Sequence, residues 1–191
     1  MREATVTRQT RETTITVAVN LDGGRVQIDT GIGFFDHMLE AFAVHSGIGM
    51  IVEAKGDLHV DGHHTVEDTG IVLGQAIAKA LGDKGGIARF GSFYVPMDES
   101  LCFASLDISG RPYLVFDARF PEEKVGDYDS CLTVEFFRAL SLHAGLTLHL
   151  RVMYGLNSHH MIEGLFKAAA HAFKEAIACS NGVLSTKGKL D

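Results

Sequence analysis

The feature that most constrains this chain is a motif that occurs twice: two adjacent histidines with a glutamate three residues after the second (HHxxE). Both copies open a long apolar, alanine-rich run that is typical of a helix. On a helix the first histidine of each copy should face its own glutamate, four residues on. The second is turned by about 100° and points elsewhere, so each copy can reach two metal ions. The residues concerned are His63, His64 and Glu67 in the first copy and His159, His160 and Glu163 in the second.

The pattern of elements around the motif repeats as well, which predicts an internal duplication. In the first half we expect strands at 3–10, 13–20, 25–29, 50–54 and 58–60, with helices at 34–45 and 64–82. In the second half we expect strands at 93–97, 101–108, 113–116 and 146–153, with helices at 130–143 and 160–178. Residues 22–24 should form a hairpin turn. The duplication register sets Gly145 on Gly47 and Glu135 on His37.

These elements predict an α+β fold. It consists of duplicated βββαβα halves, residues 1–86 and 87–191, which form one compact domain. Two sheets enclose a four-helix layer, and a pseudo-twofold axis brings the HHxxE motifs to equivalent places, in one subunit or across a subunit contact.

Composition narrows the function. A net charge of −7 over 191 residues argues against nucleic-acid binding, although a local basic pocket can still hold a phosphate. No apolar run reaches the length of a membrane helix, and the amino-terminal residues lack the apolar core of a signal peptide. Three cysteines without metal spacing, Cys102, Cys131 and Cys179, should be reduced and buried in a cytoplasmic protein.

With these motifs in view, the chain resembles imidazoleglycerol-phosphate dehydratase of histidine biosynthesis, nearly end to end. The matching stretches are 34–39, 61–68, 109–113, 157–163 and 185–188. The resemblance implies a duplicated fold of the ribosomal-protein-S5-domain-2 type and two Mn²⁺ ions per active site. It also implies a homo-oligomer of 24 subunits with sites at subunit contacts. The reaction removes water from D-erythro-imidazole glycerol phosphate and gives imidazole-acetol phosphate.

The resemblance supplies the metal ligands residue by residue: His37, His63, His64, Glu67, His159, His160 and Glu163. Many members carry histidine where this chain has Glu135, and we add Glu135 because a carboxylate also binds a hard divalent ion. Imidazole and carboxylate without thiolate suit Mn²⁺, Fe²⁺ or Zn²⁺. The helix geometry predicts two sets. One ion takes His63, Glu67, His160 and Glu135, and the other takes His159, Glu163, His64 and His37.

Resemblance and residue type together indicate the groups that handle the substrate. Proton transfer is assigned to Glu12, His45, Asp98 and Glu163. Contact with the substrate is expected for Glu12, His37 and His45. The phosphate needs cations and donors; the expected ones are Arg89, Arg111, Lys167 and, in the carboxyl-terminal tail, Ser185 and Lys187. Lys167 has independent support, because it lies one helical turn beyond Glu163.

The expected chemistry starts at the substrate's imidazole ring. Metal ions on the ring nitrogens would stabilise an imidazolate that expels the neighbouring hydroxide, and a diazafulvene-like intermediate would acidify the next C–H. Two alternatives stay open. A metal-dependent hydrolase could use a similar ligand set, and a non-catalytic metal-storage or scaffold oligomer is the second.

Several other residues have structural interpretations. His171, mid-helix among alanines, is expected to pack, and His143, the duplicate of His45, has no assigned role. Asp68 could orient a ligand histidine or favour the helix start through its charge.

Overall fold

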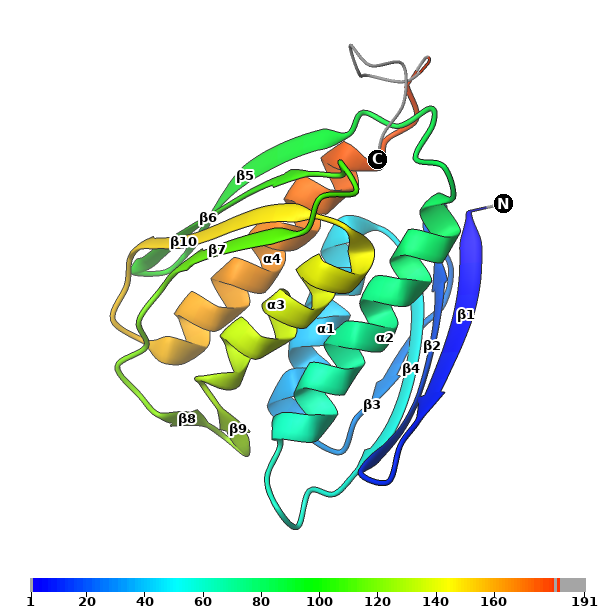
Figure 1. The fold of residues 1–191 in the computed structure, drawn as a ribbon. Coiled ribbons are helices and arrows are strands. Elements are labelled where there is room, and N and C mark those ends of the chain that lie inside the picture. Colours follow the sequence, from blue (N-terminus) through cyan, green and yellow to red (C-terminus); the bar gives the residue numbers. More distant parts are fainter. Residues whose placement is uncertain (1, 181, 183–191) are drawn as a thin grey trace.

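The computed structural model describes residues 2–180 and 182, and four helices lie between two four-stranded sheets (Figure 1). The elements of the first half are β1 (Glu3–Gln9), β2 (Thr13–Asn20), β3 (Val26–Asp29), α1 (Gly33–Ser46), β4 (Gly49–Gly56) and α2 (His63–Leu81). Those of the second are β5 (Phe90–Met97), β6 (Ser100–Asp107), β7 (Tyr113–Asp117), α3 (Leu132–Ala144), β10 (Thr147–Tyr154) and α4 (Ser158–Ala176). A short hairpin, β8 (Lys124–Val125) and β9 (Tyr128–Asp129), precedes α3.

The two sheets have the same topology, which confirms the predicted duplicated α+β fold. Their strand orders are β1-β2-β4-β3 and β5-β6-β10-β7. In each sheet three strands pair antiparallel and the last pair is parallel, β3 with β4 and β7 with β10. α1 and α3 both end at a glycine in the left-handed region, Gly47 (φ 77°) and Gly145 (φ 67°), the residues that the duplication register superimposes. The division between residues 86 and 87 stays a prediction.

The core lies between the sheets because each central strand alternates buried and exposed positions. Ile15, Val17 and Val19 of β2 turn inward and bury their apolar side chains against the helices. α2 packs closely on α3 through two glycines. A Cβ at Gly70 would meet the carbonyl oxygen of Phe136 at 2.7 Å, so only glycine allows this approach. This packing fixes the position of α2 against α3, and α2 carries the first HHxxE motif at its start.

Three local predictions are wrong. Residues 22–24 do not form a hairpin, since β2 pairs with β4 and β3 lies on the far side of β4. The chain instead crosses the end of β4, where Gly49 leaves space for the carbonyl oxygen of Gly23. Residues 58–60 form a turn and no strand. Cys102 is buried as expected, but Cys131, just before α3, and Cys179, just after α4, are exposed.

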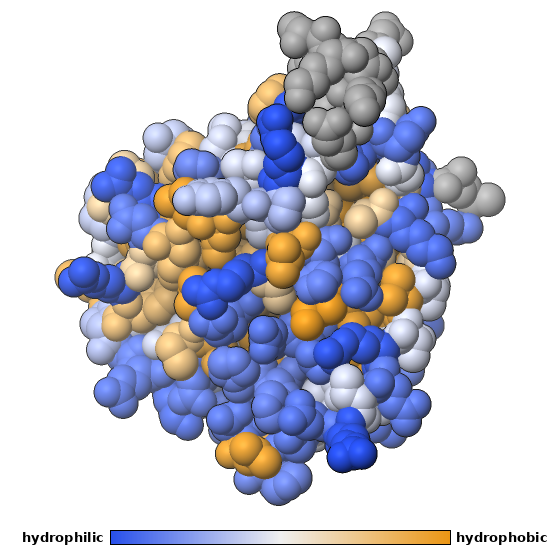
Figure 2. Space-filling model, viewed as in Figure 1, coloured by the Kyte–Doolittle hydropathy of each residue, from blue (hydrophilic) through white to orange (hydrophobic). Residues whose placement is uncertain are grey.

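The surface mixes polar and apolar regions. Figure 2 shows polar residues over much of the viewed face, with apolar side chains in patches between them. The large exposed apolar residues include Tyr113, Tyr154 and Leu156, which keep 66%, 63% and 79% of their surface accessible. Within the described residues, none of the helices has the length and apolar character needed to span a membrane.

Candidate metal centre and active site

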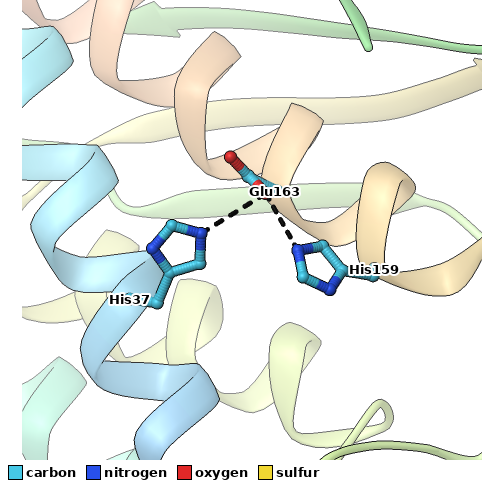
Figure 3. Close-up of side chains that lie close together, drawn as sticks. All are labelled: His37, His159 and Glu163. Carbon is cyan, nitrogen blue, oxygen red and sulfur yellow. Dashed lines mark hydrogen bonds and ion pairs between the residues drawn. The ribbon is translucent and has the colours of Figure 1, made fainter. Parts of the chain in front are cut away.

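Two helices bring three potential metal ligands together (Figure 3). His159 and Glu163 lie one turn apart on α4, and His37 reaches them from α1. The Oε2 atom of Glu163 is 3.1 Å from Nε2 of His159 and 3.5 Å from Nε2 of His37. One ligand atom from each of the three lies within 4.8 Å of the others. Among the described residues this is the one group of three or more such side chains that is compact enough to hold an ion.

Glu163 is buried and charged. Only 5% of its surface is accessible, and its Oε1 accepts a hydrogen bond from Lys167 Nζ at 2.7 Å. Burial alone would raise the pKa of Glu163, but Lys167, His37 and His159 together hold the pKa below its ordinary value. The carboxylate therefore stays ionised at neutral pH, with Oε2 turned toward the two imidazoles. An anionic oxygen beside two imidazole nitrogens fits a divalent cation.

The first HHxxE copy repeats part of this geometry at the start of α2. His63 Nε2 is 3.5 Å from Glu67 Oε2, and both side chains are almost half exposed. The predicted pairing of the first histidine with its glutamate is therefore confirmed in both copies. In the described chain no third potential ligand closes on His63 and Glu67.

The second histidine of the first copy points away from its glutamate, as predicted. His64 Nδ1 lies 3.0 and 3.1 Å from the two carboxylate oxygens of Asp57, in the loop between β4 and α2. Its Nε2 lies 3.8 Å from Glu12, in the turn between β1 and β2. The hydrogen bond to Asp57 raises the pKa of His64, and the charge of Glu12 adds to the effect.

His160, the second histidine of the other copy, has a matching pair of carboxylates. Its Nδ1 lies 2.7 Å from Oε2 of Glu99, and its Nε2 lies 3.8 Å from Asp98. Both acids form the turn between β5 and β6. The hydrogen bond to Glu99 raises the pKa of His160 and lowers that of Glu99. Glu12 and Asp98, both expected in proton transfer, thus each face the Nε2 side of a predicted ligand histidine.

The predicted division of ligands between two ions is only partly assembled within one chain. The three-residue group contains His37, His159 and Glu163 of one predicted set but lacks His64. Of the other set, Glu135 lies on α3, where its Oε2 forms an ion pair with Arg138. His160 contacts Glu99 and Asp98, and among the described residues it forms no compact group with His63 and Glu67. The division of ligands stays a prediction.

The expected phosphate-binding cations lie in two places. Arg89 forms a two-pronged ion pair with Asp107, with nitrogen–oxygen distances of 2.6 and 3.0 Å, and its guanidinium lies over the ring of Phe90. Arg111 is exposed, 3.9 Å from the same aspartate. Lys167 instead lies beside Glu163. Ser185 and Lys187 fall outside the described residues.

The sequence interpretation missed a contact of His45. Its Nδ1 lies 3.1 Å from Nε2 of His171 on α4, and the ring of Phe93 stacks on His171 with centroids 4.3 Å apart. Burial lowers the pKa of His45, and the positive charges of His171 and Lys167 lower it further. His171 therefore does more than pack the helix. Its spacing of eight residues from Glu163, on the same face of α4, is the signal that could have indicated it.

Asp68 takes neither of its two expected roles. Its Oδ2 accepts hydrogen bonds from Arg8 and from the hydroxyl of Thr13, so it ties α2 to the first two strands. Asp57 and Glu99, which do contact the predicted ligands His64 and His160, were not singled out. Glu99 is the counterpart of Glu12 through the pairing of β2 with β4 and of β6 with β10, which the sequence register does not give.

Comparisons with known proteins agree with this geometry. The family model described as imidazoleglycerol-phosphate dehydratase matches residues 30–173.

The chain belongs to the imidazoleglycerol-phosphate dehydratase family.

Relatives from bacteria with that name match over nearly the whole length. The protein of Clostridium acetobutylicum is 58% identical over 99% of this chain and 98% of its own. The protein of Lacticaseibacillus casei is 55% identical over 98% of this chain and 99% of its own length. The crystal structure of the dehydratase from Staphylococcus aureus has a TM-score of 0.86 at 41% identity, covering 93% of this chain and 99% of that one. The crystal structure of the Pyrococcus furiosus protein has a TM-score of 0.86 at 37% identity, and the match covers 97% of this chain and 100% of that one.

Proposed function

We propose that this chain is a metal-dependent imidazoleglycerol-phosphate dehydratase, a hydro-lyase that converts D-erythro-imidazole glycerol phosphate into imidazole-acetol phosphate and water in histidine biosynthesis. The observation that carries the proposal is the convergence of His37 and His159 on the buried, ionised Glu163 in a chain that belongs to this family. The resemblance further suggests two Mn²⁺ ions per active site and a cytoplasmic location; Fe²⁺ or Zn²⁺ would suit the same ligands.

The donor set fits a hard divalent cation. The group offers two imidazole nitrogens and one anionic oxygen, and Lys167 keeps the carboxylate ionised even though it is buried. When bound, such an ion supplies a Lewis acid that stabilises negative charge on a nitrogen heterocycle. The eight proposed ligands are His37, His63, His64, Glu67, Glu135, His159, His160 and Glu163.

Acid–base work on the substrate falls to side chains beside these ligands. Glu12 and Asp98 are open to a substrate, because 54% and 82% of their side-chain surfaces are accessible, and each lies on the Nε2 side of a histidine. A carboxylate there can accept the C–H proton or return one to the leaving hydroxyl. His45 is neutral at neutral pH, since its pKa is lowered, so it can accept a proton. Glu163 is the fourth candidate.

The proposed cations orient the substrate through its phosphate. Arg111 is the most accessible, with 63% of its side-chain surface exposed, and a guanidinium can grip a phosphate with two hydrogen bonds. Arg89 already forms an ion pair with Asp107, which fixes the orientation of its guanidinium group. Lys167 and the tail residues Ser185 and Lys187 complete the proposed set.

The sites are completed between subunits of a homo-oligomer, for which the resemblance suggests 24 copies. One observation supports this. The Nε2 atoms of His64 and His160 face the exposed carboxylates of Glu12 and Asp98, and neither histidine belongs to the three-residue group, so a second copy can use them.

The test is turnover of imidazoleglycerol phosphate by the purified chain, with added Mn²⁺ and after treatment with a chelator. We expect an α-keto product without release of inorganic phosphate, loss of activity with chelator and recovery with Mn²⁺. Glu163→Gln should abolish turnover. The control Glu175→Gln, on the same helix but hydrogen-bonded to the backbone of Ser92, should not. Phosphate release would indicate a hydrolase, and metal binding without either product would indicate a storage protein.

A further inference from the structure

The second histidine of each HHxxE copy has a carboxylate on its Nδ1 atom. Asp57 supplies it for His64 at 3.0 Å, and Glu99 supplies it for His160 at 2.7 Å. In both cases the Nε2 atom faces a second, exposed carboxylate at 3.8 Å, that of Glu12 for His64 and that of Asp98 for His160. Two independent occurrences of the same contact, in loops of different length, indicate a shared requirement of the two histidines.

The two carboxylates do not occupy duplicate positions. Val17 of β2 pairs with Val52, and Ala104 of β6 pairs with Leu150. Val52 and Leu150 each lie five residues beyond the superimposed glycines, so Val17 and Ala104 are counterparts. Five residues before them lie Glu12 and Glu99.

The counterpart of Glu99 in the first half is therefore Glu12, which faces Nε2 of His64. Asp57, from the loop after β4, holds the Nδ1 contact in its place. The carboxylate that contacts Nδ1 of the second histidine therefore comes from a different position in each half.

We propose that Asp57 and Glu99 are positioning residues, which fix His64 and His160 as Nδ1–H tautomers and present Nε2 to a divalent cation. Because Asp57 has taken over this contact in the first half, Glu12 is free to act on substrate. This inference rests on the proposed metal-dependent function.

The physical reason lies in the two nitrogens of neutral imidazole, one of which donates while the other accepts. A carboxylate beside Nδ1 selects the tautomer with the proton there and leaves the Nε2 lone pair for a metal. Glu99 is itself held in place: its Oε1 accepts hydrogen bonds from the backbone N–H groups of Leu156 and Asn157 and from the hydroxyl of Ser100. Oε2 is left for His160. The ring orientation is thus set before any ion arrives.

Asp57 gives the cleaner test, because its carboxylate contacts only His64 among the described hydrogen bonds and ion pairs. The full chain is stripped of metal and titrated with Mn²⁺, and free Mn²⁺ is followed by its electron paramagnetic resonance signal. We expect Asp57→Ala to weaken Mn²⁺ binding about 10- to 100-fold. Asp57→Asn keeps an oxygen that accepts from Nδ1–H and should recover most of the affinity. Asp57→Leu, similar in size but without an acceptor, should behave like the alanine variant and serves if that variant does not fold.

The matched control is Asp61→Asn, which removes a carboxylate near His64 that contacts no ring nitrogen and accepts instead from the backbone of His63. If affinity depends only on nearby negative charge, Asp57→Asn and Asp61→Asn will weaken binding equally, and the positioning role is contradicted. Unchanged affinity in Asp57→Ala and Asp57→Leu contradicts it as well. Absence of Mn²⁺ binding by the unsubstituted chain would instead overturn the proposed function itself.

The two halves allow a second arm. Glu12→Gln and Glu99→Gln change counterpart residues by the same isosteric substitution. We expect Glu12→Gln to reduce turnover of imidazoleglycerol phosphate while its Mn²⁺ affinity stays within about threefold of the unsubstituted chain. Glu99→Gln should shift Mn²⁺ affinity more than Glu12→Gln does. The reverse order would contradict the proposed exchange of roles.

Discussion

Lys167 and Glu163 lie one turn apart on α4, and the ammonium of Lys167 donates to Oε1 of Glu163 over 2.7 Å. This contact leaves Oε2 alone to face His37 and His159. Lys167 therefore fixes both the charge of the carboxylate and the oxygen that a cation can use. A phosphate that approaches Lys167 would meet a lysine that already serves the metal group.

Replacing Lys167 with methionine should destabilise the metal-free protein by about 2–3 kcal/mol, because a buried carboxylate loses its main partner. Urea unfolding in the presence of chelator, at one fixed protein concentration, measures the change in the free energy of unfolding. The double variant Lys167→Met with Glu163→Gln removes the unpaired charge and should recover part of the loss. A change below about 0.5 kcal/mol in the single variant would show that the pair is not needed for stability.

The contact of His45 with His171 predicts a pH dependence of stability. Burial lowers the pKa of both below the ordinary 6.5, and for His171 the charge of Lys174 lowers it further. The unfolded chain then binds more protons than the folded one as the pH falls below about 6.5, so the free energy of unfolding decreases in that direction. His171→Phe removes one of the two imidazoles with a lowered pKa and keeps an aromatic ring that can stack on Phe93. Its free energy of unfolding should fall less steeply than that of the unsubstituted chain between pH 8 and pH 5.5; parallel curves would contradict this.

The close approach of α2 and α3 predicts a packing effect. A Cβ at Gly70 would lie 2.7 Å from the carbonyl oxygen of Phe136 and 2.9 Å from Ala139, so Gly70→Ala must push the helices apart. We expect a loss of about 1–3 kcal/mol in the free energy of unfolding. Gly33→Ala is the matched control, because a Cβ there meets nothing within 4 Å. Equal effects of the two substitutions would refute the packing argument.

Arg111 should affect substrate affinity and leave metal binding alone. Arg111→Gln removes an exposed guanidinium, and the loss of a charge-assisted hydrogen bond of about 1.5–3 kcal/mol raises KM at least tenfold. Arg119, also exposed, provides the control substitution Arg119→Gln, for which KM should not change. Steady-state kinetics at saturating Mn²⁺ measure both. An unchanged KM for Arg111→Gln would remove Arg111 from the phosphate site.

Much of the fold and part of the site follow from sequence periodicity. The spacing of four between His159 and Glu163 placed both on one helix face, and the repeat predicted two similar halves. Periodicity does not say which strand lies beside which, so the crossing of β3 to the far side of β4 was missed. For the same reason the contacts of Asp57 with His64 and of His171 with His45 were missed, since each joins residues from separate elements whose relation depends on tertiary packing.

The most direct test of a metal-dependent site is a crystal structure of the Mn²⁺-loaded protein with anomalous diffraction measured at the manganese edge. We predict one ion bonded to Nε2 of His37, Nε2 of His159 and Oε2 of Glu163, a second ion near His63 and Glu67, and ligands from a second copy at each. Manganese peaks absent from these side chains, with both histidine doublets facing solvent in the assembled protein, would contradict the account.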